Sequence, residues 1–397
     1  MNDAPTLKMP LLSNRITKVT PSLTLSITAK AKALQAQGIH VISLSAGEPD
    51  FDTPEFIKEA AIQALHKGVT KYTPAEGTLE LRKAIASKLK RDQGLTYAPD
   101  QIVVSVGAKH SIFNLFQVLL NEGDEVLIPS PYWLSYPEIV TLSGGKSVFI
   151  KTREEHEFKM TPEQLEKHIT PRTKILVLNS PSNPTGAVYR RKELEALVPI
   201  LLKHSHVWIL SDEIYEKLIF DGVGHTSIAS LHPEMAKRTL LVNGHSKAYA
   251  MTGWRMGYAA CAKEIAEACS TLQSHSTSNP TSFAQAGAVV ALDKGDAEAK
   301  KMCEVFEKRR NLFVSELKKI PQLKPFSPQG AFYLFVNIEA TGVDSMRLSE
   351  RLLEEARVAV VPGKVFGSDC HVRLSFACSE KDILEAARRI GEWVKKL

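Results

Sequence analysis

The sequence lacks the features that would place the protein in a membrane or in a disulfide framework. Among its 397 residues, no apolar run approaches the roughly 18 that a membrane-spanning helix needs. The N-terminal stretch MNDAPTLKMPLLSNR has no long apolar core of the kind found in secretory signals. The five cysteines are an odd number without a C-x-x-C pair, which argues against disulfides and against a zinc site. We therefore expect a cytoplasmic protein with no membrane segment and no metal centre.

The sequence also has no large excess of positive or negative charge. Lys and Arg outnumber Asp and Glu by 50 to 44, and the basic residues are interleaved with acidic ones, as in KLKRD and VFEKRRN. Because no basic stripe with spaced aromatic residues is present, nucleic acid is not an expected partner. The 44% hydrophobic and 24% charged composition is typical of a globular protein, and the length predicts two domains.

Short apolar runs alternate with helical patterns through the middle of the chain. This alternation predicts an α/β fold with a largely parallel sheet covered by helices on both faces. The expected strands are Ile102–Val106, Glu125–Ile128, Ile175–Leu178, Val207–Leu210 and Thr239–Val242, and the helices between them include Ala108–Leu120 and Lys192–Lys203.

The C-terminal part has a pattern typical of a smaller α+β domain. The charged amphipathic segment Asp296–Ile320 predicts a connecting helix, and a final helix is expected from Glu380. The N-terminal helix Ser26–Gln37 and strand Val41–Leu44 are too little to fold alone, so we expect them to pack on this domain. The expected organisation is 1–47 on the small domain, 48–312 as the large domain and 313–397 as the small domain. The expected C-terminal strands are Phe332–Val336, Val358–Val361 and Val372–Phe376.

Polar residues gather where four of the expected central strands end. In a parallel sheet, ligands bind beyond the carboxyl ends of the strands, so four such clusters predict one site. The clusters are Gly107-Ala108-Lys109-His110, Asn179 with SPSNPTG, Ser211-Asp212-Glu213-Ile214-Tyr215, and Ser246-Lys247.

Two of these clusters carry groups suited to a phosphate. Gly107 and Ala108 open a helix, where free backbone N–H groups and the helix dipole attract an anion, although a plain tight turn would have the same residues. Ser246 and Arg255 can supply a hydroxyl and a bidentate guanidinium to the same anion. Between them, burial and a neighbouring cation would both disfavour the ammonium form of Lys247 and leave a nucleophilic amine.

The other two clusters carry groups suited to a planar ring. Asp212 can pair with a protonated ring nitrogen, and Tyr215 and Asn183 can hydrogen-bond a phenolic oxygen. Trp133, in PSPYWLSYP, either offers a flat face for stacking or is an ordinary core residue. A lysine for an aldehyde, an acid for a pyridine nitrogen, donors for a ring oxygen and a phosphate cup together predict pyridoxal phosphate as the cofactor.

With these motifs the sequence resembles the class I/II pyridoxal-phosphate aminotransferases of fold type I, and within them the bacterial aspartate aminotransferases of the Iβ type. The resemblance covers nearly the whole chain. It implies a large domain with a mostly parallel seven-stranded sheet between helices, and a smaller α+β domain built from both termini. The matching motifs are SAGEPDFDTP (45–54), KYTPAEGTLELRKAI (71–85), GAKHSIFNL (107–115), SPYWLSYPE (130–138), NSPSNPTGAVY (179–189), SDEIYEKL (211–218), HSKAYAMTGWRMGY (245–258), PQGAFYLF (328–335) and HVRLSFA (371–377).

The resemblance implies a cofactor role for each matching residue. Lys247 would hold the cofactor covalently and then act as general base and acid, while Asp212 would keep the pyridine nitrogen protonated. Tyr215 would bind the ring oxygen together with an asparagine, and a tryptophan would stack on the ring. The complete cofactor set implied is Lys247, Asp212, Tyr215, Asn183, Trp133, Gly107, Ala108, Lys109, Ser246, Arg255 and Tyr72.

The family also implies partners. Tyr72 resembles a tyrosine that reaches the phosphate from the other subunit, which implies a homodimer with active sites at the subunit interface. The substrates would be amino acids and 2-oxo acids. Arg373 would bind the substrate α-carboxylate, helped by the Gly47 backbone and Asn183, with Trp133 alongside; a surface or strand-end arginine is the plain alternative.

One stretch departs from the animal and enteric aspartate aminotransferases. Those enzymes bind the distal carboxylate with an arginine from the other subunit, but the corresponding stretch here, SHSTSNPTSFAQ (274–285), contains no arginine. In the Iβ enzymes a lysine of the GAK or GGK turn has this role, and Lys109 matches it, unless it is a solvated first-turn lysine. Thr24 matches a threonine that works beside that lysine. The same pair resembles that of members that accept prephenate to give arogenate.

We therefore expect a ping-pong aspartate:2-oxoglutarate aminotransferase, with prephenate as a hypothesis for a second acceptor. A transaminase of aromatic or aliphatic amino acids, or a β-lyase, would share the fold, but Lys109 and Thr24 favour a dicarboxylate. A ligand-sensing regulator would carry an added DNA-binding domain, whereas the family pattern here begins by about residue 14. A non-catalytic binding module would not be expected to keep the full set Lys247, Asp212, Tyr215 and Arg373.

Overall fold

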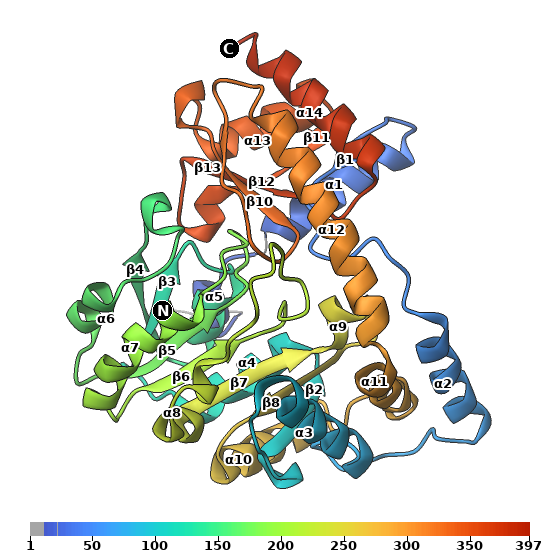
Figure 1. The fold of residues 1–397 in the computed structure, drawn as a ribbon, viewed down its shortest axis with the longest axis vertical. Helices are drawn as coiled ribbons and strands as arrows, with labels where there is room; N and C mark the ends of the chain where they lie inside the picture. Colours follow the sequence, from blue (N-terminus) through green and yellow to red (C-terminus); the bar gives the residue numbers. More distant parts are fainter. Residues whose placement is uncertain (1–11, 22) are drawn as a thin grey trace, which may run out of the picture.

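The computed structural model describes residues 12–21 and 23–397, and a seven-stranded sheet forms the centre of its larger unit (Figure 1). The strand order is β2-β8-β7-β6-β5-β3-β4. Neighbouring strands are parallel, except that β8 is antiparallel to both β2 and β7. The predicted α/β class and mostly parallel sheet are confirmed. The strands are β2 Ile102–Val106, β3 Glu125–Ser130, β4 Lys146–Lys151, β5 Thr173–Asn179, β6 Trp208–Asp212, β7 Thr239–Gly244 and β8 Met256–Ala260.

Five of these strands agree with the predicted ones to within two residues at each end, whereas β4 and β8 were not predicted. β4 lies at an edge of the sheet and buries only Ile150, so its apolar signal is weak. β8 reads MGYAA and is rich in small residues because it passes close to the N-terminus of helix α4 (Ala108–Leu119): a Cβ on Gly257 would lie 2.1 Å from the backbone nitrogen of Ala108. Neither strand shows the long apolar run of a central strand.

Helices cover both faces of this sheet. They are α2 Glu55–His66, α3 Leu79–Gln93, α4 Ala108–Leu119, α5 Ser135–Leu142, α6 Pro162–His168, α7 Arg191–Lys203, α8 Pro233–Arg238, α9 His245–Ala248, α10 Lys263–Ser274 and α11 Ser282–Lys294. Side chains of a strand alternate between the two faces. In β5, Ile175 and Val177 pack in the core that contains α4 and α5, whereas Leu176 and Leu178 pack against α6 and α7. Both faces of the central strands are therefore buried.

A four-stranded antiparallel sheet, in the order β12-β13-β10-β9, forms the centre of the smaller unit. The long helix α12 (Asp296–Leu317) runs from the large unit along this sheet (Figure 1). No helix in the described part of the chain is both long enough and apolar enough to cross a bilayer. The other elements here are β9 Lys324–Pro325, β10 Tyr333–Asn337, β12 Val361–Pro362, β13 His371–Ser375, α13 Ser345–Glu355 and α14 Glu380–Val394.

The N-terminal residues from Leu23 onward pack on the smaller unit. Helix α1 (Leu23–Ala36) places Ala31 in a small core with Leu353. Strand β1 (Ile42–Ser43) pairs in parallel with β11 (Val358–Ala359). The division into 1–47, 48–312 and 313–397 stays a prediction, and residues 1–11 and 22 of its first segment lie outside the described residues.

The prediction of one strand over Val358–Val361 was wrong. The chain changes sheets within this run, because β11 pairs with β1 while β12 pairs with β13. Val360, between the two strands, is fully buried. Hydrophobicity alone did not show the change of partner, since buried valines occupy both sheets.

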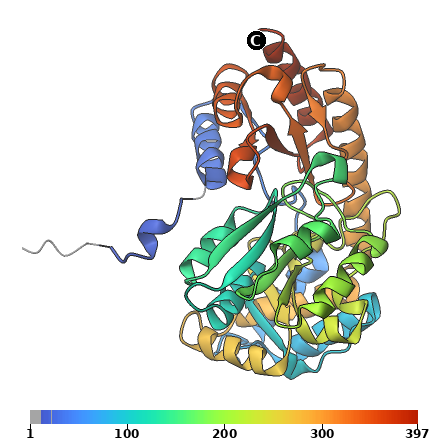
Figure 2. The same cartoon turned by 90° about the vertical axis from the view of Figure 1, so that its left-hand side faces the viewer.

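The first described residues extend away from the rest of the molecule. Figure 2 shows residues 12–21 as an arm beside the large unit. Its short 3-10 helix, Ile16–Lys18, buries no residue, and Leu12 and Ile16 are exposed. The backbone N–H of Thr20 donates a hydrogen bond to Glu138 at 3.0 Å. The arm is thus held to its own chain by few contacts.

Candidate active site

A cavity of about 560 Å³ opens between the two units, at the carboxyl ends of the parallel strands. All four predicted polar clusters contribute to its wall, so the expected convergence at one edge of the sheet is seen. Every predicted site residue except Gly107 and Tyr72 lines it. Those lining residues are Thr24, Gly47, Ala108, Lys109, Trp133, Asn183, Asp212, Tyr215, Ser246, Lys247, Arg255 and Arg373.

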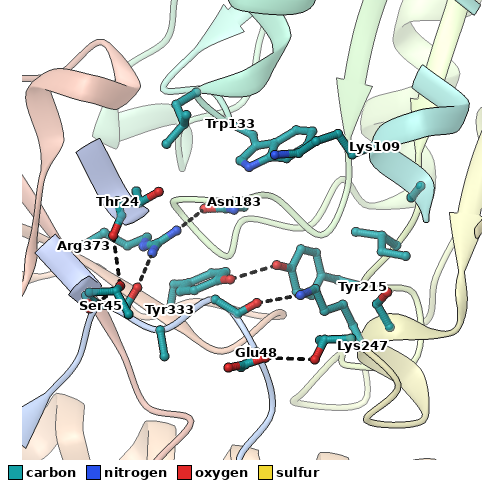
Figure 3. Close-up of a pocket in the computed structure, with 18 of the residues that line it drawn as sticks. Thr24, Ser45, Glu48, Lys109, Trp133, Asn183, Tyr215, Lys247, Tyr333 and Arg373 are labelled. Atoms are coloured by element: carbon teal, nitrogen blue, oxygen red, sulfur yellow. Dashed lines mark hydrogen bonds between the residues drawn. The ribbon is translucent and has the colours of Figure 1, made fainter. Parts of the chain in front are cut away.

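Lys247 lies on the short helix α9, which directly follows β7. Its Nζ donates a hydrogen bond to the carbonyl oxygen of Gly47 at 2.5 Å (Figure 3). Burial lowers the pKa of Lys247 to about 8, with Arg255 and Arg373 acting in the same direction and Glu48 opposing them. A substantial fraction of this amine is therefore neutral, and so nucleophilic, near neutral pH.

Asp212 ends β6 with its carboxylate in the wall of the cavity and only 4% of the residue exposed. The Tyr136 hydroxyl donates to Oδ2 at 2.6 Å, and the Ile214 backbone N–H donates to Oδ1 at 3.3 Å. Burial raises the pKa of Asp212 to about 6, although these two donors lower it. A buried carboxylate of raised proton affinity is suited to holding a proton on a ring nitrogen.

Arg373, in β13, is buried with only 3% of its surface exposed. Its guanidinium donates to the Asn183 side-chain oxygen at 2.9 Å and to the Ser45 carbonyl at 3.0 Å, and it lies 4.3 Å from the ring centroid of Tyr333 (Figure 3). None of the described carboxylates forms an ion pair with it. A buried cation without an anionic partner is costly, so this geometry favours an anionic ligand.

The corner of the cavity beside α4 has the geometry of an anion cradle. Gly107 has a φ of +85°, and a Cβ there would lie 2.4 Å from the Arg255 guanidinium. Gly107 therefore lies directly behind the Arg255 guanidinium and does not itself line the cavity. The Arg255 guanidinium donates to the Thr252 and Val106 carbonyls at 2.9 and 3.3 Å, and no described carboxylate pairs with it. Together with the N-terminus of α4, it can hold a phosphate.

Lys109 and Thr24 line the same cavity from different elements. The Lys109 Nζ lies 5.0 Å from the ring centroid of Trp133, and burial followed by Arg255 lowers the pKa of this lysine. Thr24 belongs to α1. In Figure 3, Thr24 lies on the Arg373 side of the cavity and Lys109 lies beside Trp133. The structure therefore places the predicted pair in one cavity but on different walls.

Tyr72 is the predicted residue that lies apart. It sits in the loop between α2 and α3, is 90% exposed and does not line the cavity of its own chain. Within one chain, Tyr72 takes no part in the site.

Three residues of the site were missed from the sequence. The hydroxyl of Tyr333 is 2.9 Å from that of Tyr215, and its ring lies under Arg373. Tyr136 binds Asp212, and Glu48 accepts a hydrogen bond from Thr252 at 2.8 Å close to Lys247. All three lie within the motifs quoted above, so the signal was present. Tyr136, for example, follows Trp133 by three residues in the first turn of a helix, which places both on one side.

The residues present fit pyridoxal phosphate. The amine of Lys247 has a lowered pKa, the Asp212 carboxylate is buried with room on the cavity side, and the Gly107 corner is a cradle that a Cβ would fill. The cavity volume lies within the range of about 300–1,000 Å³ usual for ligand sites. An amine, an acid and a phosphate cradle thus border one space of suitable size.

Comparison with known proteins agrees with this geometry. The sequence model of the family described as "Aminotransferase class I and II" matches residues 39–390. The chain is 51% identical over 389 residues to an aspartate aminotransferase of Geobacillus stearothermophilus, covering 97% of this chain and 99% of that one. It is 47% identical to an aspartate/prephenate aminotransferase of Cereibacter sphaeroides, over 96% and 98% of the two chains. The solved aspartate aminotransferase of Thermus thermophilus with maleate superposes with a TM-score of 0.93 at 45% identity, covering 97% and 100%.

Proposed function

The chain belongs to the class I and II aminotransferases, and from this premise we propose that it transfers the amino group of aspartate to 2-oxoglutarate. The products are oxaloacetate and glutamate, formed in two half-reactions. One observation carries the choice of a dicarboxylate: of the five lysines and arginines that line the cavity, Arg373 and Lys109 lie on different walls, and no described carboxylate forms an ion pair with either. Aspartate carries one carboxylate for each. Both relatives named above carry aspartate in their names.

The family implies pyridoxal phosphate, and each nearby group has a task toward it. When bound, the cofactor supplies an aldehyde carbon for amines and a ring that stabilises negative charge at the substrate Cα. Lys247 would hold it covalently and, once displaced by substrate, its neutral Nζ would move the proton from the substrate Cα to the former aldehyde carbon, and in the opposite direction in the second half-reaction. Asp212 holds the proton of the ring nitrogen, and Tyr215 donates to the ring oxygen. The α4 N-terminus, Ser246 and Arg255 hold the phosphate.

The substrate is oriented by its α-carboxylate. Arg373 offers a planar fork that matches a carboxylate, and its contact with Asn183 fixes the plane of that fork. The ammonium group of Lys109, which lies over the Trp133 ring, then binds the distal carboxylate. The two contacts together hold Cα near Lys247.

Substitution of Lys109 tests the role in dicarboxylate binding. Lys109→Ala is expected to lower kcat/KM for aspartate by about 10- to 100-fold, since a close charge pair contributes about 1.5–3 kcal/mol. Alanine and phenylalanine, which lack the distal carboxylate, should change by less than about threefold. Lys32→Ala is the matched control, because Lys32 also lines the cavity from α1. Equal losses on all three amino acids would refute the assignment.

Prephenate is proposed as a second amino acceptor. The proposal rests on Thr24 and Lys109, and on the name of the Cereibacter relative. A panel of oxaloacetate, 2-oxoglutarate and prephenate as acceptors tests it, with aspartate or glutamate as donor. Arogenate formation from prephenate is expected. Turnover of the first two acceptors without any arogenate would restrict the enzyme to aspartate and glutamate. Release of ammonia, pyruvate and a thiol from a cysteine S-conjugate, tested separately, would instead indicate a β-lyase.

The active unit is proposed to be a homodimer. Exposed apolar residues cluster on α2 and the loop after it: Ile62, Leu65, Val69 and Leu79 are each 39–45% exposed, and Tyr72 is 90% exposed. The arm of residues 12–21 also carries exposed apolar side chains. A second copy of the chain would bury these surfaces and bring Tyr72 to the phosphate corner of the partner site. A cytoplasmic location is part of the same proposal, and cell fractionation tests it.

Mixed dimers test whether Tyr72 acts across the interface. Lys247→Ala and Tyr72→Ala subunits would each form impaired homodimers. In a mixed dimer, however, one site keeps both an intact Lys247 and an intact partner Tyr72. Activity should therefore reappear on co-expression of the two variants, at up to about half of the wild-type value per mixed dimer. No recovery in verified mixed dimers would place Tyr72 outside the partner site.

A further inference from the structure

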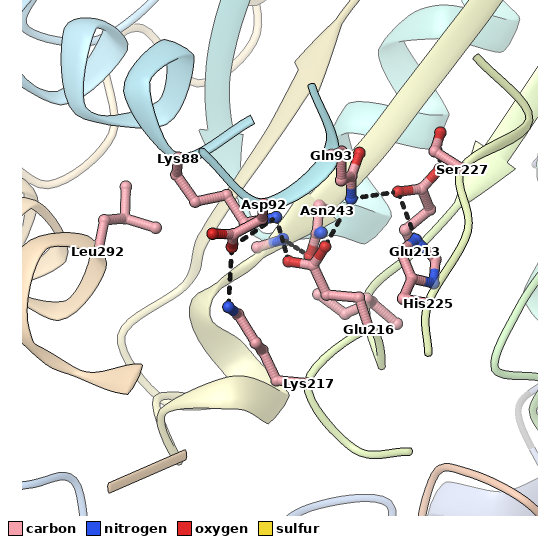
Figure 4. A network of polar contacts seen from close by, with 12 residues as sticks. Lys88, Asp92, Gln93, Glu213, Glu216, Lys217, His225, Ser227, Asn243 and Leu292 are labelled. Atoms are coloured by element: carbon pink, nitrogen blue, oxygen red, sulfur yellow. Dashed lines mark hydrogen bonds and ion pairs between the residues drawn. The ribbon is translucent and has the colours of Figure 1, made fainter. Parts of the chain in front are cut away.

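A network of charged and polar residues surrounds Glu213, the residue that follows Asp212 in the sequence (Figure 4). Glu213 is 1% exposed and does not line the cavity. Its carboxylate accepts four hydrogen bonds, two on each oxygen, so its acceptor capacity is fully used. The donors are the Ser211 hydroxyl at 2.8 Å, the Ser227 hydroxyl at 2.6 Å, the Gln93 amide at 2.8 Å and the His225 Nε2 at 2.9 Å.

These donors come from separate parts of the chain. Ser211 is in β6, Gln93 ends α3, and His225 and Ser227 lie in the loop before the 3-10 helix Ile228–Ser230. The backbone N–H of Glu213 also donates to the Val242 carbonyl of β7 at 2.9 Å. Glu213 thus makes hydrogen bonds to α3, β6, β7 and the loop before Ile228, and it does so directly next to Asp212 in the chain.

A second layer of charged residues joins the network through Gln93. Gln93 also donates to Glu216 at 2.7 Å, and Glu216 forms a close ion pair with Lys88. Lys88 in turn lies 3.9 Å from Asp92. The remaining charged members are Lys217, Arg91 and Asp296, which join the network through Asp92.

The charges of this network balance with one proton on His225. Carboxylates outnumber lysines and arginines by one among its members. Burial alone would lower the pKa of His225, but the Glu213 carboxylate outweighs burial and raises it. Burial would likewise raise the pKa of Glu213, but His225 and the hydroxyl donors lower it. Glu213 is therefore an ionised carboxylate held in a fixed place.

A metal ion is a weaker explanation for the same residues. Ligand atoms of Glu213, Glu216 and His225 lie within 4.8 Å of one another, a spacing that a cation could use. However, the Gln93 amide already donates to both carboxylates, and the Lys88 ammonium pairs with Glu216. Protein cations and donors thus fill the positions that an ion would take.

We propose that Glu213 is a positioning residue for the proposed transamination: it fixes Asp212 at the end of β6 and places a second negative charge directly behind the carboxylate that faces the ring nitrogen. This inference rests on the proposed function. The ring nitrogen and Asp212 would share one proton. The negative charges of Asp212 and Glu213 both attract this proton, so together they favour its staying on that pair. Glu213 is among the groups that raise the pKa of Asp212, after burial.

Glu213→Gln tests the proposal, with Glu216→Gln as the matched control. Both variants remove one negative charge from the same network, but only residue 213 adjoins Asp212. Glu213→Gln is expected to lower kcat about tenfold, the effect of roughly one pKa unit, with less than a threefold change in KM for aspartate. Glu216→Gln should leave kcat within about twofold of wild type, because residue 216 neither adjoins Asp212 nor lines the cavity.

The ¹⁵N NMR shift of ring-labelled pyridoxal phosphate separates positioning from plain destabilisation. In Glu213→Gln the ¹⁵N shift should move toward the value of an unprotonated ring nitrogen. The pH at which the ring nitrogen loses its proton should be lower in this variant than in wild type or Glu216→Gln. Identical shifts and identical kcat values for the two variants would overturn the inference. A wild-type protein that fails to bind the cofactor, or does not respond to aspartate, would instead overturn the proposed function.

A milder pair of variants applies if Glu213→Gln does not fold. Ser227→Ala removes one donor from Glu213, while Ser230→Ala removes a hydroxyl that bonds only the Ser227 carbonyl. Ser227→Ala is expected to lower kcat about two- to fivefold with a smaller displacement of the ¹⁵N shift, since it removes only one of the four donors and leaves the Glu213 charge in place. Ser230→Ala should leave both unchanged. Equal behaviour of the two serine variants would count against the role of Glu213.

Discussion

The two ends of the cavity are built in different ways. The end proposed for the cofactor comes from neighbouring strands of one sheet: Asn179 pairs with Asp212 in register, and Asp212 pairs with Val242 of the strand that leads to Lys247. The end proposed for the substrate joins Arg373 of the smaller unit to Asn183 of the large unit, which is 190 residues away in the sequence. The first is fixed by strand pairing within one sheet. The second depends on how the two units pack.

This difference separates chemistry from recognition. Changes at the sheet end should affect the chemical step and cofactor attachment, whereas changes at the Arg373 end should affect the affinity for substrate. Tyr333 is the exception, because it is on β10 of the smaller unit yet bonds Tyr215 of the large one. It is the natural place to look for coupling between the two ends.

Replacement of Lys247 should give the largest effect. Lys247→Ala is expected to lower kcat for aspartate and 2-oxoglutarate by more than about 1,000-fold, because both the covalent attachment and the proton transfer are lost. Lys247→Arg keeps the charge but cannot supply a neutral amine, so it should be as impaired. A coupled assay of oxaloacetate formation measures both. Retention of activity in the arginine variant would show that charge alone suffices.

Replacement of Arg373 should give the next largest effect, and only at the other end. Arg373→Ala is expected to lower kcat/KM for aspartate about 100-fold or more, as a buried carboxylate contact of about 3 kcal/mol is lost. Arg373→Lys should recover only part, since lysine lacks the planar fork. Absorbance titration should show unchanged cofactor affinity in both variants. A matched loss of cofactor binding would contradict the separation of the two ends.

The rate of cofactor attachment should depend on pH through Lys247. Its pKa is lowered to about 8, and the neutral amine is the form that reacts, so attachment to cofactor-free protein should accelerate as the pH rises and level off above about 8. Below pH 8 the rate should fall about tenfold per pH unit, as the neutral fraction does. Stopped-flow absorbance measures this profile. A midpoint near the ordinary lysine value of 10.5 would mean that burial has no effect on the amine.

Removal of the Tyr333 hydroxyl should give the smallest effect but touch both ends. Tyr333→Phe loses one hydrogen bond to Tyr215 while keeping the ring under Arg373, so about 0.5–1.5 kcal/mol is at stake, or roughly two- to tenfold. Steady-state kinetics with aspartate should show a change in kcat and a smaller one in KM. The double variant Tyr215→Phe/Tyr333→Phe should be less impaired than the product of the two single effects. Strict multiplication would show that the two hydroxyls act independently.

The sheet end could be predicted from local sequence, because its residues follow strands directly. Asp212 and Lys247 were placed by reading where apolar runs end, before any family was considered. The same reasoning missed β8, whose small residues are dictated by close contact with Ala108, a fact that no local pattern contains. It also missed Tyr333, which read as one more apolar position of a strand.

The substrate end needed more than local patterns. Nothing near Arg373 in the sequence indicates Ser45 or Asn183 as its neighbours. Ser45 meets it because the N-terminal segment packs on the smaller unit, and Asn183 meets it because the two units pack together. The family resemblance supplied Arg373, Lys109 and Thr24. The network around Glu213 was only partly accessible to local patterns, because Gln93 lies 120 residues from Glu213 in the sequence, whereas Ser211, His225 and Ser227 are close by.

Ser45 and Gly47 are two residues apart, yet their carbonyl oxygens accept hydrogen bonds from Arg373 and Lys247, respectively. The strand just before them is anchored, because Leu44 donates to Ala359 and accepts from Ser375. This short segment of backbone therefore fixes the distance between the guanidinium of Arg373 and the amine of Lys247. Inserting or deleting one residue between positions 45 and 47 would change the spacing of these two carbonyl oxygens, although every side chain of the site would be kept.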